Sequence, residues 1–333
     1  MQYSNYIGHV SQLSGIEEHR LIGGKGDGMR LLEVRNGLGL ACTVSADRCA
    51  DIPRMSFMGQ NVGYFSPCGH VAPHYYDKEG TNWLNSFTAG FLTTCGLNAV
   101  GSPCVDEGEA LPLHGTIANT PAEHVWWRRE SDALVVDADM CDSGIFGRKL
   151  TMHRKLEFST VENRLRITDT VENHGETSTP IMILYHMNMG YPLLSEKAEL
   201  FIPSVRVTPR DEHAANGLGT LMQIFPPTEG YIEQCFFHEF EKEGRAMIFN
   251  PDIGIGLEIT FDTTLLNTLC QWKMFGKHDY VLGLEPGNCT PAGRDVMRRE
   301  GKLQFLASGD KTEFSVDVQF FSDKQEWEAH KAK

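Results

Sequence analysis

The sequence predicts an all-β protein built from many short antiparallel strands, and two observations carry this prediction. Apolar residues alternate with polar ones in several segments, among them residues 150–158 and 314–320. A period of two buries one face of a strand and leaves the other in water, which is typical of antiparallel sheets. Helical patterns are weak, and Gly, Pro, Asn and Asp separate the alternating segments. Together these features favour a large β-sandwich with few short helices.

Individual elements follow from local signals along the chain. The Asn-Gly pair at residues 36–37 precedes alternation over residues 38–44, which predicts an early hairpin. Residues 162–163 predict a turn that leads into a strand over residues 165–171. The polar segment 323–333 predicts a short terminal helix or a frayed end.

The organisation of the chain is uniform apart from one segment. The 333 residues contain no internal repeat, low-complexity tract or linker-like stretch. All-β units can reach this length as one domain, so we expect residues 1–333 to form a single domain. Residues 67–121 differ because they are rich in Gly, His and aromatic residues and lack clean alternation. Long loops of this kind are frequently functional, so we expect this segment to contribute to a site.

Charge and cysteine usage narrow the function classes. Lys and Arg number 30 and Asp and Glu number 44, so the formal charge is 30 − 44 = −14. Such a surface repels phosphate backbones and anionic lipid, which argues against nucleic-acid and membrane partners. No apolar run approaches the ~18 residues of a membrane span. The nine Cys show no C-x-x-C spacing, and the first residues do not resemble a signal peptide. These features predict free thiols and a cytoplasmic location.

Three titratable residues stand out by their apolar sequence neighbours. Glu285 follows Val-Leu-Gly-Leu and precedes a Pro-Gly turn. Withdrawal from water at such a strand end raises the pKa of a carboxyl group, which suits a general base near neutral pH. His114 lies between Leu-Pro-Leu and a Gly, and His186 ends a strongly apolar segment. Each histidine could equally be a buried structural side chain, and the residues alone leave that alternative open.

Histidine spacing allows a metal site without specifying one. His70 and His74 lie four residues apart and could join His114 around a metal ion. Pro73 argues against a shared helix face for the first two, and no spacing indicates a fourth ligand. We therefore expect no metal at these histidines, while a metal-dependent enzyme remains an alternative.

Taken in order, the segments around His114, His186 and Glu285 resemble the galactose mutarotase-like (aldose 1-epimerase) superfamily, and more closely its DUF4432 branch. The resemblance includes Leu-His-Gly, Tyr-His-Met-Asn and Leu-Glu-Pro at these three positions. It extends through residues 47–67 and 87–115 and through the closing segment LASGDKTEFSVDVQFF. The resemblance implies a twisted antiparallel β-supersandwich whose concave face holds a sugar, and a reaction that needs no cofactor.

The same resemblance implies roles for these residues. Glu285 would be the base that removes the proton of the anomeric hydroxyl, and His186 the acid that protonates the ring oxygen. The ring then opens to the aldehyde, and reclosure gives the other anomer. His114 would hold sugar hydroxyls or assist at the ring oxygen. The implied substrate is a monosaccharide or a sugar derivative.

The remaining sugar contacts are less sharply indicated. Classical mutarotases have an Asn before the second His and an aromatic residue two positions after it, where this chain has Tyr185 and Asn188. Glu233 is our candidate for the mid-chain Asp of those enzymes, although Gln234 and His238 lie close enough in sequence to replace it. Trp272 and Lys273 could line the same face. The candidate substrate-binding residues are therefore Arg54, Asp51, His74, Asn188, Glu233 and Lys273.

Other functions remain open at this point. The same sandwich could carry another carbohydrate isomerase, or a lyase that removes a proton next to a carbonyl. A non-catalytic protein could instead bind sugar through aromatic side chains such as Trp83, Trp126 or Trp127. Exposed sheet edges also make a homodimer a reasonable expectation.

Overall fold

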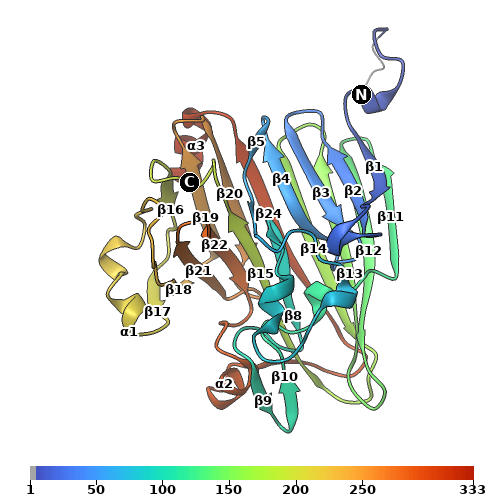
Figure 1. Cartoon of the computed structure of the whole chain (residues 1–333), viewed down its shortest axis with the longest axis vertical. Coiled ribbons are helices and arrows are strands. Elements are labelled where there is room, and N and C mark those ends of the chain that lie inside the picture. The colour runs from blue at the N-terminus through green and yellow to red at the C-terminus, as the bar shows by residue number, and fades with distance from the viewer. Residues whose placement is uncertain (1–4) are drawn as a thin grey trace.

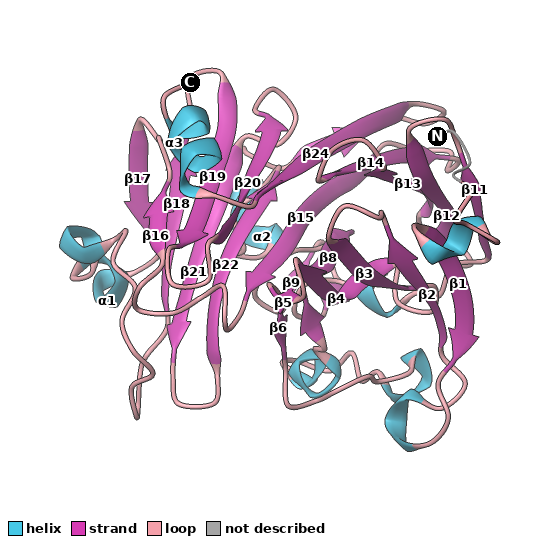
Figure 2. Ribbon diagram, turned by 90° about the horizontal axis from the view of Figure 1, so that it is seen from above, coloured by secondary structure: helices cyan, strands magenta, loops and turns pink. Residues whose placement is uncertain are grey.

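The computed structural model describes residues 5–333 and is built mainly of two antiparallel sheets that face each other (Figures 1 and 2). Figure 2 shows how strongly both sheets twist and curve. In spatial order the larger sheet contains β1 (Gly15–Arg20), β2 (Arg30–Arg35), β3 (Leu40–Ser45), β4 (Asp51–Phe57), β8 (Leu92–Leu97), β15 (Thr179–Met189), β22 (Tyr280–Gly287), β21 (Thr268–Phe275), β18 (Gln234–Glu239) and β17 (Arg206–Pro209), with β5 (Gln60–Asn61) on β4 and β23 (Gln304–Leu306) on β15.

The second sheet covers one face of the first. In spatial order it contains β11 (His124–Arg129), β12 (Ala133–Ser143), β13 (Lys149–Ser159), β14 (Arg164–Asn173), β24 (Lys311–Phe321), β20 (Ile255–Asp262), β19 (Glu243–Asn250) and β16 (Glu199–Phe201). Two short pairs complete the strands: β9 (Cys104–Asp106) with β10 (Glu109–Leu111), and β6 (Tyr64–Phe65) with β7 (Ala89–Gly90).

Helices are short and lie at the edges and ends of the sheets (Figure 1). The α-helices are α1 (Glu212–Ala215), α2 (Arg294–Arg299) and α3 (Lys324–Lys331). The 3₁₀ turns are η1 (Val10–Gln12), η2 (Gly24–Gly26), η3 (Pro73–Tyr75), η4 (Asn82–Ser86), η5 (Ile117–Asn119) and η6 (Leu218–Thr220). Within residues 5–333, no helix is long and apolar enough to cross a membrane.

The predicted all-β architecture is confirmed, and the core follows from the period-two pattern. Strand β13 alternates buried and partly exposed residues along its length, and its buried residues face the larger sheet. The early hairpin joins β2 to β3, where Asn36 Oδ1 accepts hydrogen bonds from the backbone of Leu38 and Leu40. The residues at 162–163 join β13 to β14, as predicted. The polar C-terminal segment forms α3, which Asp323 caps.

Two expectations about local structure are wrong. The segment 67–121 is not one long loop, because it contains the central strand β8. All six residues of β8 are buried, so both faces are covered and the sequence shows no alternation. The Pro-Gly pair after Glu285 is not a turn, since Pro286 and Gly287 belong to β22 and pair with β21. Glu285 therefore lies inside a strand.

A buried arginine joins the two sheets. Arg154 on β13 is fully buried, and its guanidinium donates to Asp169 at 2.6 and 2.8 Å and to Asp51 at 2.7 Å. It also donates to the Thr94 hydroxyl and to a backbone carbonyl, so all five of its N–H groups are used. Tyr185 on β15 donates its hydroxyl hydrogen to Asp169 at 2.8 Å. The cluster therefore links β13 and β14 to β4, β8 and β15.

Replacement of Arg154 by Ala is expected to destabilise the protein strongly. The change leaves Asp51 and Asp169 buried without their cation, and breaking a buried pair in this way costs about 3–5 kcal/mol. Urea denaturation measures the loss. The matched control is Arg166→Ala, which removes a half-exposed pair with Asp317 and is expected to cost about 0–1 kcal/mol. Equal losses in the two variants would contradict a structural role for the cluster.

Candidate active site

His186 and Glu285 lie side by side on the face of the larger sheet that points away from the second sheet. They belong to β15 and β22, which are neighbouring antiparallel strands. Cys270 on β21 pairs directly with Glu285, and Thr93 on β8 pairs with His186. The ladder pairs on either side place His186 opposite Glu285: Leu184↔Gly287 and Asn188↔Gly283. These four side chains therefore form one row across four strands.

The facing atoms of His186 and Glu285 have no hydrogen-bond partners. His186 Nδ1 lies 3.2 Å from Glu285 Oε1, and the two residues are 6% and 1% exposed. The orientation is not that of a hydrogen bond, and neither atom has another partner among the described residues. Buried polar atoms are nearly always hydrogen-bonded in proteins, so an orphaned pair at the wall of a cavity points to a ligand.

A cavity of about 360 Å³ opens above this pair. This size lies within the range of small-molecule sites. Aromatic rings wall it, charged residues stand at its rim, and two thiols lie beside the carboxylate. The residues that line it are Trp83, Leu84, Phe87, Gly101, Ser102, Leu113, His114, His186, Arg210, Glu233, Cys235, Cys270, Trp272, Glu285 and Pro291.

His114 enters the cavity from the loop that follows β10. It has a φ of 58°, and a side chain on the following Gly115 would overlap the backbone oxygen of Gly96. The chain therefore turns sharply here and packs against β8. Gly101 N–H donates to Nδ1 of His114 at 3.4 Å, which assigns the proton of the neutral ring to Nε2. The ring centroid lies 4.9 Å from Trp83 and 5.7 Å from His186.

Glu233 is fixed at the rim by two donors. Its Oε1 accepts from Arg210 Nη1 at 2.7 Å, and its Oε2 accepts from Trp272 Nε1 at the same distance. The carboxylate remains partly exposed, and each oxygen has room for a further hydrogen bond. The Trp272 ring in turn meets His186 edge-on at 5.3 Å. This arrangement couples the rim of the cavity to the His186–Glu285 pair.

Burial favours the uncharged forms of the central groups. It raises the pKa of Glu285 well above its usual value, and the charges of Cys235 and Glu233 add to this effect. Burial lowers the pKa of His186 to about 3, and the neighbouring His114 contributes. The pKa of His114 falls to about 4 for the same main reason, against the opposing charge of Glu233. Near neutral pH both imidazoles are therefore uncharged.

The structure brings four of the predicted site residues into the cavity and leaves the others outside its lining. Inside are Glu285, His186, His114 and Glu233. Asp51 lies between the sheets, bonded to Arg154 and Thr94. Arg54 is exposed and stacks on Phe65, and His74 is exposed beside Tyr75. Asn188 is buried under the site, where its amide donates to backbone oxygens of Gly90 and His186.

Lys273 does not share a face with Trp272, and the expectation that it does is wrong. Consecutive residues of a strand point to opposite sides, so the cavity receives Trp272 while Lys273 turns away. The Lys273 ammonium is buried and donates to the backbone oxygens of Thr220 and Leu221. Burial lowers its pKa to about 8.

Several lining residues were not found from the sequence. Arg210 follows β17 and bonds Glu233, from which it is separated by more than twenty residues that include α1 and η6, and no local pattern indicates this contact. Cys270 could have been found by a simple signal, because it lies two residues before Trp272 on the same strand and so shares its face. The thiol of Cys235 joins them from β18.

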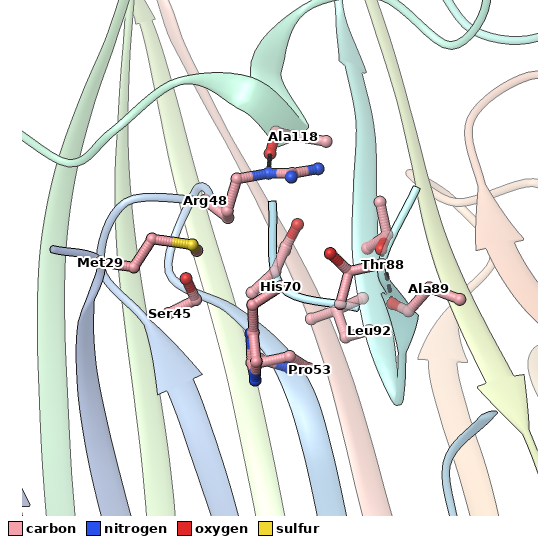
Figure 3. Close-up of a pocket in the computed structure, with 11 residues that line it drawn as sticks. Met29, Ser45, Arg48, Pro53, His70, Thr88, Ala89, Leu92 and Ala118 are labelled. Atoms are coloured by element: carbon pink, nitrogen blue, oxygen red, sulfur yellow. Dashed lines mark hydrogen bonds between the residues drawn. The ribbon is translucent and has the colours of Figure 1, made fainter. Parts of the chain in front are cut away.

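A second, smaller cavity lies beside β4 and β8 and has room for about one water molecule (Figure 3). Its volume is about 20 Å³, and Figure 3 shows Arg48 bonded to the backbone oxygen of Ala118 at its wall. Ser45 Oγ and His70 Nδ1 line it without hydrogen-bond partners among residues 5–333. No group of three or more His, Cys, Asp or Glu side chains in the described part of the chain is placed to hold a metal ion.

Comparison with known protein families identifies the family of this chain. Residues 26–320 match the family described as a domain of unknown function, DUF4432. The chain belongs to the DUF4432 family. No curated protein sequence matches this DUF4432 protein.

Solved structures share its fold. A proposed aldose 1-epimerase from Klebsiella pneumoniae superimposes with a TM-score of 0.88 at 26% identity, covering 94% of this chain and 85% of its own. The galactose 1-epimerase from Lactobacillus acidophilus gives 0.64 at 16% identity, with 93% and 99% covered. A galactose mutarotase-like protein from Clostridium acetobutylicum gives 0.67 at 13% identity, with 93% and 99% covered. The DUF4432 protein therefore has the galactose mutarotase-like β-sandwich fold.

Both cavity histidines are expected to stay uncharged as the pH falls from 8 to 5. Their lowered pKa values, about 3 for His186 and about 4 for His114, lie below the ~6.5 of an unfolded histidine. At these two positions the unfolded chain therefore binds more protons in this window, so the contribution of the two histidines to folding stability decreases as the pH falls below about 6.5. Nitrogen-15 NMR titration of the imidazoles measures this, with His186→Gln and His114→Gln as assignment controls. A signal that titrates near pH 6.5 and disappears in either variant would contradict the expectation.

Proposed function

We propose that this DUF4432 protein is an aldose 1-epimerase that interconverts the anomers of a free sugar. The observation that carries the proposal is the orphaned contact of 3.2 Å between His186 and Glu285 at the cavity wall. The anomeric hydroxyl and the ring oxygen of an aldose are bonded to the same carbon. An acid and a base that serve these two oxygens must therefore be close neighbours, as these groups are.

The pair can supply one acid and one base near neutral pH. Besides the N–H of the neutral imidazole, the two groups share one further proton, and burial favours its place on Glu285. Since their facing atoms are 3.2 Å apart, the proton can pass to His186 when a sugar shields the resulting charges. Glu285 is then ionised and serves as the base, while His186 is charged and serves as the acid.

Ring opening follows from this state. Glu285 takes the proton of the anomeric hydroxyl, His186 gives a proton to the ring oxygen, and the bond between C1 and the ring oxygen breaks as the C1 carbonyl forms. Rotation about the C1–C2 bond exposes the other carbonyl face. Reclosure with the roles reversed returns both protons and gives the other anomer. General acid and general base catalysis each contribute about 10²–10⁴-fold.

The remaining lining residues have the properties of a sugar site. The Nε2–H of His114 can donate to a ring oxygen or a hydroxyl, and the Glu233 carboxylate can accept from hydroxyl groups. Trp83, Phe87 and Trp272 offer apolar surface to the C–H face of a pyranose. These groups hold the sugar while the pair transfers protons.

The charges of the cavity favour a neutral sugar. Among the described lining residues Arg210 is the single Lys or Arg, and it already bonds Glu233 and Asp211. The two cavity imidazoles are uncharged near neutral pH. An anionic sugar would therefore meet the Glu233 carboxylate without a free cation to offset it.

Anomer exchange in the presence of the protein tests the proposal. Magnetisation-transfer NMR on a panel of aldoses is expected to show acceleration that falls by about 10²-fold or more in Glu285→Gln, since the base is lost. Glu172→Gln, which changes an exposed carboxylate on β14, is the control and is expected to match the wild type. Absence of acceleration on every aldose, or full activity of Glu285→Gln, would refute the function. Deuterium at carbon in the same samples would instead indicate an isomerase or a lyase.

Sugar charge gives a separate expectation. Neutral aldoses should exchange at least about tenfold faster than the matching uronic acids and sugar phosphates, because Glu233 repels an anion and Arg210 is already paired with Glu233 and Asp211. The Glu233→Gln variant frees Arg210 and should narrow this ratio. Comparison of exchange rates at equal sugar concentration measures both effects. A faster rate with a sugar phosphate would show that the cavity is built for anions.

A further inference from the structure

The carboxylate of Glu285 lies over Gly283. The two residues are on the same face of β22, and a side-chain carbon on Gly283 would overlap Oε1 of Glu285 and lie 3.0 Å from its Cδ. The same carbon would lie 3.0 Å from Cβ of Trp272. The missing side chain therefore makes the space in which the carboxylate rests. Gly283 has no positive φ, so backbone conformation does not explain a glycine here.

Cys270 reaches the carboxylate from the neighbouring strand. It is the direct ladder partner of Glu285 in the pairing of β21 with β22, and it is 1% exposed. Directly opposed residues on one face of an antiparallel pair have Cβ atoms about 4.5–5.5 Å apart, so the thiol lies beside the carboxylate, and it opposes the rise in the pKa of Glu285 that burial causes. Both residues line the cavity. Behind Cys270 lies the thiol of Cys235, whose sulfur accepts from Arg210 Nη1 at 3.1 Å.

A buried general base needs such a donor. Burial opposes ionisation of Glu285, and its Oε1 has no hydrogen-bond partner within residues 5–333. A thiol is a weak donor, so it offsets burial only in part and leaves a carboxylate that still binds protons readily. The other titratable or charged groups that face Glu285 are His186 from β15, His114 from its loop, Cys235 and Glu233 from β18 and the loop before it, and Cys95 from β8.

We infer that Cys270 and Gly283 are positioning residues for Glu285: Gly283 leaves the space for the carboxylate, and Cys270 donates a hydrogen bond to it. The catalytic importance of these two residues rests on the proposed function, whereas their effect on the Glu285 carboxylate does not. In this arrangement Cys270 acts through Glu285 and not on the reacting atoms. Its removal should therefore change proton transfer more than sugar binding.

Infrared difference titration of the Glu285 carboxyl, with Glu285→Gln to identify its band, tests the inference without turnover. Cys270→Ala is expected to move the titration to higher pH by roughly 0.5–1 unit, because a donor to the charged form is lost. Cys270→Ser keeps a donor and should titrate at or below the wild-type pH. Cys42→Ala, which removes a buried thiol on β3, is the matched control and should leave the titration unchanged. Wild-type titration in both Cys270 variants would overturn the inference.

Kinetics and structure separate this inference from the proposed function. If the protein is an epimerase, the alkaline limb of kcat against pH moves upward with the infrared titration in Cys270→Ala, while KM stays within about twofold. If the Glu285 titration shifts in Cys270→Ala but the wild-type protein accelerates no anomer exchange, the positioning role of Cys270 is supported and the proposed function is refuted. Gly283→Ala adds an independent arm, in which a crystal structure should show the carboxylate displaced. An undisplaced carboxylate there would overturn the role of Gly283.

Discussion

The buried pairing of Arg154 with two carboxylates is the constraint on which the geometry of the site depends. A guanidinium can be held between two sheets only if every donor is used, so the partners on β4, β8 and β14 must all be in register. Thr94 bonds Arg154, and Tyr185 bonds Asp169, the carboxylate that Arg154 holds; these two residues are chain neighbours of Thr93 and His186. Since consecutive strand residues face opposite sides, a core that fixes Thr94 and Tyr185 also fixes the row on the other face.

The exclusion of water from the cavity also determines the charge state of the central pair. The aromatic walls that suit a sugar also remove the solvent that would keep Glu285 and His186 charged. An electrically neutral pair with one proton is the state that such surroundings tolerate best. The polar groups at the rim, Arg210 and Glu233, are more exposed and are paired with each other.

The sequence predicts the strands that have one solvent-exposed face, and it predicts the site residues that lie within apolar segments. It placed the first hairpin, the turn at residues 162–163 and the last strand, because each has a period of two or a turn signal. It missed β8, which is buried on both faces. Asp51 and Lys273 were placed beside the sugar although their side chains lie elsewhere, since a linear motif does not say on which face a residue falls. Arg210 was missed because its contact with Glu233 depends on tertiary structure alone.

The row from Thr93 to Cys270 has a consequence for folding. Its members come from three parts of the chain that are far apart, namely β8, β15 and the consecutive strands β21 and β22, and the cavity walls come from still other segments. No fragment of the chain brings His186 beside Glu285 before β15 and β22 have paired across roughly a hundred intervening residues. Contacts of such long range close late and slowly. The cavity therefore forms only with the complete native topology. It is absent from any intermediate in which β15 and β22 have not yet paired.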